Sequence, residues 1–226
     1  MSESSRNATE TTAPAWLAEM RRDYTLGRLR RRELSPDPIL QFQKWLEEAA
    51  QAKALEPNAM TLATVNNKGQ PSARTVLLKG LDARGFVFFT HYTSAKGRDL
   101  AENPRAALVF HWRELERQVS VCGTAARISP LESEAYFKLR PHASRLAAWA
   151  SRQSETIPDR QWLDGKFADA ARKYPGEDVS MPPYWGGYVV TPATMEFWQG
   201  GASRLHDRFR YTRQDNGTWV IERLSP

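Results

Sequence analysis

Apolar and polar residues follow two different periods along this chain. After Asp37 and Pro38, apolar residues recur at three- and four-residue spacing from Ile39 to Ala49, which predicts an amphipathic helix with Asp37 as its N-cap. Elsewhere, short β-rich runs alternate with turn residues. These runs predict strands at residues 60–65, 72–79, 85–90, 105–112, 116–128, 187–191, 194–199, 208–213 and 218–223.

Further helices separate some of these strands. The sequence Ser129-Pro130-Leu131-Glu132 is a capping box, so a helix should begin there and run to about Leu139. Other helices are predicted at residues 94–102, 144–151 and 159–174. Many short strands joined by tight turns are typical of a closed or nearly closed antiparallel barrel with helices packed outside it. The expected fold class is mainly β with flanking helices (α+β).

Composition is consistent with one packed domain. The chain has 226 residues, of which 41% are hydrophobic and 26% are charged, enough apolar material for a core. Residues 1–20 are expected to form a disordered tail, and residues 21–226 a single domain that begins with a basic arm. No apolar run reaches membrane-spanning length and no secretory signal is evident. Cys122 is the only cysteine, so we expect a cytoplasmic protein without disulfides.

Charge and motifs narrow the possible functions. The formal net charge of +6 admits nucleic acid, an acidic membrane surface or a phosphorylated small molecule as partner. No glycine-rich nucleotide loop and no Gly-x-Ser-x-Gly elbow is present. The four histidines, at positions 91, 111, 142 and 206, lack metal-ligand spacing, so no metal site is expected.

The segment Arg74-Thr75-Val76-Leu77-Leu78-Lys79 is the first candidate for ligand binding. On a strand, Arg74, Val76 and Leu78 would face one side and the other three residues the opposite side. An apolar strand with cations at its ends could lie against a flat ring while the cations reach a phosphate. Taken alone, a core strand with solvated ends is the commoner explanation.

The segment Arg204-Leu205-His206-Asp207-Arg208 is the second candidate. If it is extended, Arg204, His206 and Arg208 share a face, where an anion or an electron-rich ring would relieve their repulsion. A solvated loop is an equally good explanation. The nearby aromatic pair Phe197 and Trp198 could wall a planar ligand or simply belong to the core.

Tyr136, Arg140 and Ser144 form the third candidate. Tyr136 and Arg140 are four residues apart on the predicted helix and so share a face, and Ser144 lies about a turn beyond. Two hydroxyls and a guanidinium could hold a phosphate. An exposed helix end with a favourable C-terminal arginine is the alternative, and the simpler one in isolation.

Taken together, these segments resemble the pyridoxine/pyridoxamine 5′-phosphate oxidase family over residues 21–226. The resemblance is carried by Arg21-Arg22-Asp23-Tyr24, residues 74–79, Glu116-Arg117-Gln118-Val119, Ser151-Arg152-Gln153-Ser154, Pro183-Tyr184-Trp185-Gly186-Gly187, Glu196-Phe197-Trp198-Gln199-Gly200-Gly201 and residues 204–208. The last two segments, in this order near the C-terminus, are highly specific.

The resemblance implies an FMN-binding split β-barrel homodimer with one FMN in each of two clefts between the subunits. The residues expected to hold FMN are Arg74, Thr75, Val76, Leu77, Leu78, Lys79, Phe89, Thr90, Lys96, Gln118, Gln153, Ser154, Trp198 and Arg208. Those expected to hold the substrate are Arg21, Arg22, Asp23, Tyr24, Lys79, Tyr136, Arg140, Ser144, Arg204, Leu205 and His206. Arg204 and His206 would face the pyridine ring and are the expected catalytic residues.

Three positions depart from the usual family pattern. Ala95 stands where an arginine is common, Phe89 where tyrosine is frequent, and Asp23 where glutamate is frequent. Only Ala95 bears on cofactor affinity, because it removes an expected phosphate contact. Arg98, three residues later on the predicted helix, is a candidate replacement.

The activity implied by the resemblance is oxidation of pyridoxamine or pyridoxine 5′-phosphate to pyridoxal 5′-phosphate, with dioxygen as acceptor and hydrogen peroxide as product. The amine would also release ammonia. Two alternatives remain: a flavin oxidase of the same fold acting on a phenazine precursor, and a nucleic-acid-binding protein using the arginines of residues 28–32. We expect neither nucleic acid nor membrane as a partner.

Overall fold

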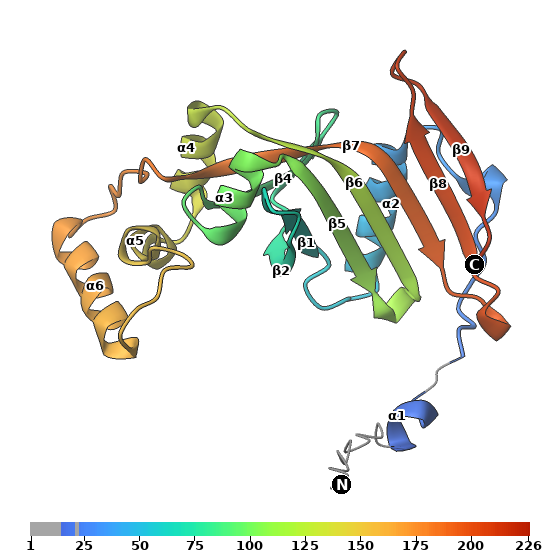
Figure 1. Cartoon of the computed structure of the whole chain (residues 1–226), viewed down its shortest axis with the longest axis horizontal. Helices are drawn as coiled ribbons and strands as arrows, with labels where there is room; N and C mark the ends of the chain where they lie inside the picture. The colour runs from blue at the N-terminus through green and yellow to red at the C-terminus, as the bar shows by residue number, and fades with distance from the viewer. Residues whose placement is uncertain (1–14, 21–22) are drawn as a thin grey trace, which may run out of the picture.

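The computed structural model describes residues 15–20 and 23–226 of the chain (Figure 1). The helices are α1 (Ala15–Glu19), α2 (Pro38–Gln51), α3 (Ala95–Glu102), α4 (Pro130–Leu139), α5 (His142–Ala150) and α6 (Arg160–Lys173), with 3₁₀ turns η1 (Arg31–Glu33), η2 (Arg113–Leu115) and η3 (Ala202–Arg204). The strands are β1 (Ala59–Val65), β2 (Pro71–Leu77), β3 (Gly80–Asp82), β4 (Gly85–His91), β5 (Arg105–Trp112), β6 (Arg117–Arg127), β7 (Trp185–Gln199), β8 (Asp207–Arg213) and β9 (Trp219–Leu224).

The helix starts expected from capping sequences are confirmed. Asp37 accepts a hydrogen bond from the Ile39 backbone N–H at 2.8 Å and begins α2. Ser129 and Glu132 form a reciprocal capping box at the start of α4. Residues 1–14 of the expected tail lie outside the described residues, and the short helix α1 occupies most of the rest of it.

All strand pairs in the described part of the chain are antiparallel and belong to one curled sheet. The strand order is β2-β1-β5-β6-β7-β4-β3, with β8 and β9 added along the other part of β7. Residues 78–79 join β2 to β3, which stand at opposite ends of this order. The backbone N–H of Lys79 donates to the Val87 carbonyl of β4 at 2.8 Å, so the sheet curls back on itself. This half-barrel confirms the expected mainly-β class.

Strand β7 differs from the sequence prediction, which had two strands with a break near Pro192. It is one strand of 15 residues that pairs with β6, β4 and β8. Cys122 pairs with Thr194 and Gly123 with Pro192, so Ala193 is the extra residue of a bulge. A Cβ on Gly123 would stand 2.1 Å from the Thr191 carbonyl oxygen, so glycine permits the close approach at this bulge. The proline therefore bends the strand without ending it.

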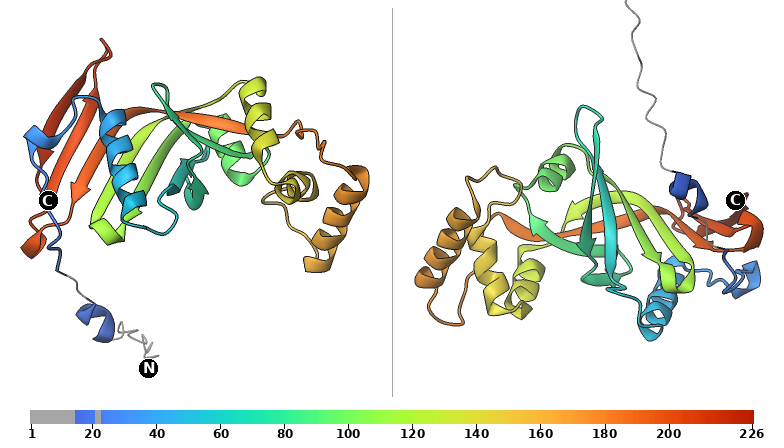
Figure 2. Two further views of the ribbon diagram at one scale, coloured as in Figure 1. Left: turned by 180° about the vertical axis from the view of Figure 1, so that it is seen from behind. Right: turned by 90° about the horizontal axis from the view of Figure 1, so that it is seen from below.

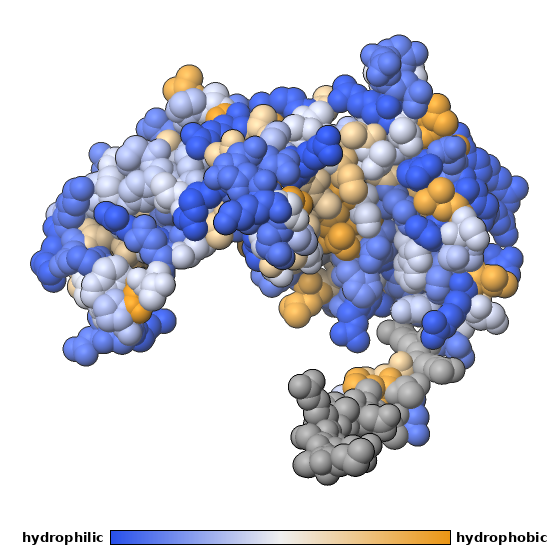
Figure 3. Space-filling view, viewed as in Figure 1, coloured by the Kyte–Doolittle hydropathy of each residue, from blue (hydrophilic) through white to orange (hydrophobic). Residues whose placement is uncertain are grey.

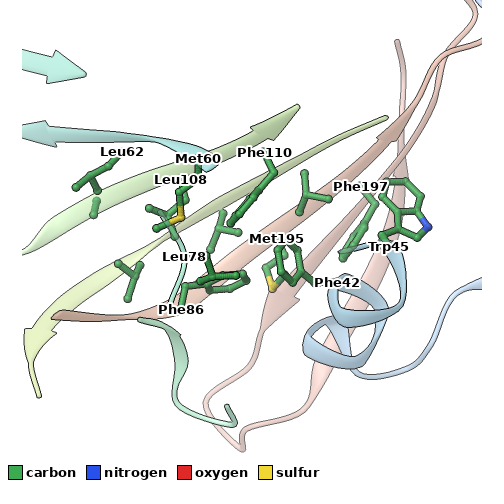
Figure 4. Close-up of a cluster of buried hydrophobic side chains, with 14 of the residues drawn as sticks. Phe42, Trp45, Met60, Leu62, Leu78, Phe86, Leu108, Phe110, Met195 and Phe197 are labelled. Atoms are coloured by element: carbon green, nitrogen blue, oxygen red, sulfur yellow. The ribbon is translucent and has the colours of Figure 1, made fainter. Parts of the chain in front are cut away.

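The main core lies between the curled sheet and α2 (Figure 4). Phe42 is fully buried, with its ring centroid 4.7 Å from that of Phe110 and 4.9 Å from that of Phe86. Trp45, one turn later, packs edge-on against Phe197 of β7 at 5.2 Å. The apolar face predicted for residues 39–49 is thus the face that fills the half-barrel.

A smaller core forms where α4, α5 and α6 gather beyond one end of the sheet. It contains Phe137, Leu146 and Trp185, the first residue of β7. Figures 1 and 2 show these helices at one end of the long axis and β8 and β9 at the other. Strand β7 connects the two ends of the molecule.

Candidate functional site

A cavity of about 690 Å³ opens where β2 and β4 meet α4 and α5. It collects predicted site residues from segments far apart in the sequence. Those that line it are Thr75, Val76, Leu77, Lys79, Phe89, Thr90, Lys96, Tyr136, Arg140, Ser144 and Gln153. Its lining includes three cations and no aspartate or glutamate, so the cavity is suited to an anion.

Lys96 is the most buried cation of this cavity. The N-cap Ser94 begins α3, and Gly97 lets this helix approach the backbone of Tyr92, where a Cβ would stand 2.2 Å from the carbonyl oxygen. The ammonium of Lys96 donates to Gln153 at 2.8 Å and to Thr90 at 3.3 Å. Burial, together with the charge of Arg74, lowers the pKa of Lys96 to about 8. A bound anion would offset both effects.

Arg140 lines the same cavity from the end of α4. Its guanidinium lies 4.8 Å from the ring centroid of Trp185, and Nη1 is buried without a hydrogen-bond partner among the described residues. Burial lowers the pKa of this arginine. Tyr136, one turn earlier, stacks on Phe89 at 3.9 Å. The predicted sharing of a helix face by Tyr136 and Arg140 is confirmed, and Ser144 reaches the same cavity from α5.

The side chains of residues 74–79 do not all face the cavity. Thr75, Leu77 and Lys79 line the cavity with Val76, whereas Leu78 is buried in the core. Arg74 is not among the lining residues: it donates to the Leu62 carbonyl and the Thr64 hydroxyl, and lies 3.9 Å from Asp99. Strand β2 also ends at Leu77, two residues earlier than predicted, because the chain turns there into β3, which the sequence did not reveal.

A second cluster, of Asp23, Tyr24, Trp198, Arg204 and His206, surrounds a cavity of about 570 Å³. The ring centroid of His206 lies 4.6 Å from that of Trp198, and Tyr24 meets both rings edge-on. Backbone N–H of Gly201 donates to Nδ1 of His206 at 3.2 Å, which leaves the proton of a neutral ring on Nε2. Arg204 is exposed and has a positive φ of 62°.

The segment that carries Tyr24 is held in place by two carboxylates that accept hydrogen bonds from its backbone. These contacts were not predicted from the sequence. Buried Glu116 accepts hydrogen bonds from the backbone N–H groups of Thr25 at 2.8 Å and Leu26 at 3.0 Å. Asp207 accepts one from Leu29 at 3.0 Å. Gly200 makes room for Tyr24, since a Cβ there would lie 2.8 Å from that side chain. These contacts fix Tyr24 over Trp198.

The remaining predicted residues lie outside the first cavity. Gln118 on β6 donates to Ser120, Ser154 is exposed with a φ of 74°, and Leu205 is exposed. Arg208 on β8 forms a two-point ion pair with Glu196, with distances of 2.7 and 3.1 Å. Arg21 and Arg22 lie outside the described residues.

The structure gives no support to Arg98 as a replacement for the arginine that is absent at position 95. Its side chain is exposed, donates to the Thr93 carbonyl and does not line the first cavity. The helix turns Arg98 toward solvent, whereas Lys96 points inward. His91, which the sequence analysis set aside for lack of metal spacing, is a lining residue instead.

The two clusters stand far apart on one chain. The first cavity includes Trp185 at the start of β7, and the second includes Trp198 near its end. At about 3.3 Å per residue, these two positions are roughly 40 Å apart along the strand. Figure 1 shows β7 running from the helical end of the molecule to β8. One small molecule cannot contact both clusters of the same chain.

Neither a membrane-spanning helix nor a metal-binding cluster is present among the described residues. Within residues 15–20 and 23–226, no helix combines the length and apolar character needed to cross a membrane. The same residues contain no group of three His, Cys, Asp or Glu side chains that could hold a metal ion.

Comparison with known proteins gives a consistent result. The profile of the family described as "Pyridoxamine 5′-phosphate oxidase" matches residues 46–173, and that of the "Pyridoxine 5′-phosphate oxidase C-terminal dimerisation region" matches residues 185–226. A pyridoxine/pyridoxamine 5′-phosphate oxidase of Nostoc punctiforme is 54% identical over 210 residues, covering 93% of this chain and 98% of the relative. That of Cupriavidus necator is 56% identical over 210 residues, covering 93% and 99%.

Solved structures agree in fold. PhzG from Burkholderia lata 383, in complex with tetrahydrophenazine-1-carboxylic acid, superposes with a TM-score of 0.83 at 33% identity, covering 89% of this chain and 99% of that one. A pyridoxamine 5′-phosphate oxidase-related, FMN-binding protein from Nostoc punctiforme has a TM-score of 0.69 at 20% identity, covering 85% and 100%. The sequence identity over nearly the whole chain decides the assignment: the chain belongs to the pyridoxamine 5′-phosphate oxidase family.

Proposed function

We propose that this chain is an FMN-dependent oxidase that converts pyridoxamine 5′-phosphate and pyridoxine 5′-phosphate into pyridoxal 5′-phosphate. Dioxygen is the acceptor, hydrogen peroxide is a product, and the amine also yields ammonia. One observation carries the proposal: the first cavity combines Lys79, Lys96 and Arg140 with no acidic lining residue. Two phosphate esters, cofactor and substrate, would supply the missing negative charge. Relatives more than half identical to the chain have the activity in their names.

Lys96 and its hydrogen-bond partners fit the FMN phosphate. Lys96, Thr90 and Gln153 already form a connected polar group. The strand from Thr75 to Leu77 offers backbone and apolar side chains along which a flat ring can lie. The chemistry that FMN supplies when bound is acceptance of a hydride equivalent and its delivery to dioxygen.

Arg140 and the hydroxyl groups that line the cavity with it fit the substrate phosphate. Arg140 has an unpartnered buried nitrogen in the described structure, and Tyr136, Ser144 and Lys79 line the same space. Binding the phosphate there uses energy remote from the reacting carbon to align the pyridine ring. The phosphate contacts are made before and during the reaction, so they favour binding more than turnover.

The second cluster completes the site from another subunit. Because the clusters of one chain are roughly 40 Å apart along β7, we infer a homodimer in which the partner subunit's Arg204 and the partner subunit's His206 cover the substrate ring. A groove of about 440 Å³, lined mainly by alanine, valine and other small residues of β1, β5, β6 and β7, offers a surface for such association. Figure 3 shows apolar side chains gathered over β5 and β6.

Arg204 and His206 act in this proposal by positioning the substrate. The hydrogen bond from Gly201 holds the His206 ring with Nε2–H as its free donor. Arg204 is exposed in the single chain and available to a ring on the partner. No residue is assigned as a dedicated general base. We infer that the enzyme works in the cytoplasm and uses neither nucleic acid nor membrane as a partner.

A phenazine-type substrate is the second candidate, because PhzG superposes closely on this chain. The buried Nη1 of Arg140, which has no hydrogen-bond partner among the described residues, favours the phosphorylated pyridine instead. An aerobic assay of the FMN-loaded protein decides between them by following pyridoxal 5′-phosphate and peroxide. Equal amounts of both products from pyridoxine or pyridoxamine 5′-phosphate are expected. Oxidation of a dihydrophenazine carboxylate with no turnover of either phosphate ester would contradict the proposal.

A further inference from the structure

His91 is a cavity residue to which the preceding argument gives no role. It is the last residue of β4 and only 6% exposed, and it lines the first cavity. Its Nδ1 is buried and has no hydrogen-bond partner in the described part of the chain. A buried polar atom in this state is unfavourable unless something else satisfies it.

The surroundings of His91 are positive. Lys96 approaches from α3 and Arg140 from the end of α4, and both charges act on the imidazole. The ring of Tyr184, from the segment before β7, lies 5.2 Å away, and Tyr136 and Lys79 line the same cavity. Burial first, then Arg140 and Lys96, lower the pKa of His91 to about 4. The empty protein therefore holds this ring neutral at physiological pH.

A phosphate ester in the cavity would reverse this balance. Its two negative charges would lie near the same cations and would favour a protonated imidazole, as nearby opposite charge does in general. The protonated ring carries an N–H on both nitrogens and could donate a hydrogen bond to a phosphate oxygen. A histidine is the side chain whose charge such a change can switch near neutral pH.

We propose that His91 is a proton-binding ligand of a phosphate ester in this cavity: it is neutral in the empty site and takes up one proton from solvent when the ester binds. It then acts as a further cation beside Lys96 and Arg140. The inference rests on the proposed function, because the ester is FMN or the pyridine substrate, but ligand binding tests it without turnover.

The test is calorimetry in two buffers that differ in ionisation enthalpy, which counts the protons taken up on binding. One arm adds FMN to the full chain stripped of flavin, and the other adds pyridoxal 5′-phosphate to the FMN-loaded protein. The variant is His91→Asn, which keeps a polar side chain that cannot titrate, with His91→Gln as a second variant if the first does not fold. His111→Asn, an exposed histidine on β5, is the matched control.

Wild type and His111→Asn should take up more protons per site than His91→Asn in one of the two arms, and that arm identifies the ester. In that arm, His91→Asn should bind about tenfold more weakly at pH 6, the size of one charge-assisted contact, with a smaller difference at pH 8.5. The ester's own titration is common to all variants and cancels.

Equal proton uptake and equal pH dependence in wild type and His91→Asn would overturn the proposal, as would the absence of proton-linked binding in both arms. Failure of the proposed function has a different signature. In that case neither pyridoxamine nor pyridoxine 5′-phosphate is oxidised, whatever number of protons is taken up on binding. An intact oxidase with unchanged proton uptake would refute only the role of His91.

Discussion

The ammonium of Lys96 lies 2.8 Å from the side-chain oxygen of Gln153, although the two residues are 57 positions apart in the sequence. Thr90 joins the same group through bonds to both. The described residues provide no carboxylate within ion-pair distance of Lys96, and its pKa is lowered to about 8. An amide oxygen satisfies the ammonium by hydrogen bonding but leaves its charge uncompensated, as an anion-binding site requires.

The pH dependence of FMN binding should therefore follow the protonation of the Lys96 ammonium. Above pH 8 the empty protein loses this proton, whereas a bound phosphate favours the charged form, so binding requires proton uptake and weakens as pH rises. Fluorescence titration of FMN between pH 7 and pH 10 measures it. Lys96→Arg, which stays charged, should bind with little change over this range. Lys96→Met should bind about 1.5–3 kcal/mol more weakly and should lose the fall in affinity above pH 8. A wild-type profile in this variant would refute the assignment.

Glu116 should keep the segment that carries Tyr24 ordered against the sheet. Replacing it by alanine removes the acceptor of the Thr25 and Leu26 backbone N–H groups, at a cost of about 1–3 kcal/mol in local stability. Trypsin should then cleave faster after Arg28 and Arg30, and the Michaelis constant should rise. Glu47→Gln is the control, since Glu47 is exposed and its carboxylate accepts a hydrogen bond from Gln43 of the same helix. Unchanged cleavage in Glu116→Ala would show that other contacts hold the segment.

Arg140 and Arg204 should give different kinetic signatures. Arg140→Ala should remove the proposed phosphate contact, which would be present in both ground and transition states, so it should mainly raise the Michaelis constant. Arg204→Ala should disturb how the pyridine ring lies on the flavin, so it should slow anaerobic flavin reduction even at saturating substrate. Rapid mixing measures both quantities. If Arg204→Ala lowered only substrate affinity and left the limiting reduction rate intact, the positioning role would be wrong.

Local chemistry made part of the fold predictable. Asp37 and Ser129 begin helices because their side chains satisfy backbone N–H groups within a few residues, and this requires no distant partner. The turn at residues 77–80 and the continuity of β7 depend instead on pairing with β4 and β6. The local sequence pattern does not reveal this pairing. Strand propensity predicted a break between two strands at Pro192, but the bulge at Ala193 accommodates the proline within one strand.

Many of the residues that line the first cavity could be predicted from the sequence, whereas their arrangement could not. Tyr136 and Arg140 could be placed on one face because helical spacing is fixed. That Leu78 faces the core, that Arg98 faces solvent and that His91 faces the cavity follow from how the sheet curls and where α3 docks. The separation of Trp185 from Trp198 by one long strand became visible only with the strand itself.

The central claim, that each site is built from two subunits, is tested most directly with heterodimers of defined composition. Two differently tagged chains, one Arg140→Ala and one Arg204→Ala, are co-expressed, and the doubly tagged dimer is purified. One of its two sites then combines an unmodified first cavity with the partner subunit's unmodified Arg204, so about half of the wild-type kcat/KM is expected. A dimer of wild type with a chain carrying both changes has a defect in each site and should be nearly inactive. If that second dimer kept half of the activity while the first showed only the mean of its parent homodimers, the site would lie within one chain and the account would be wrong.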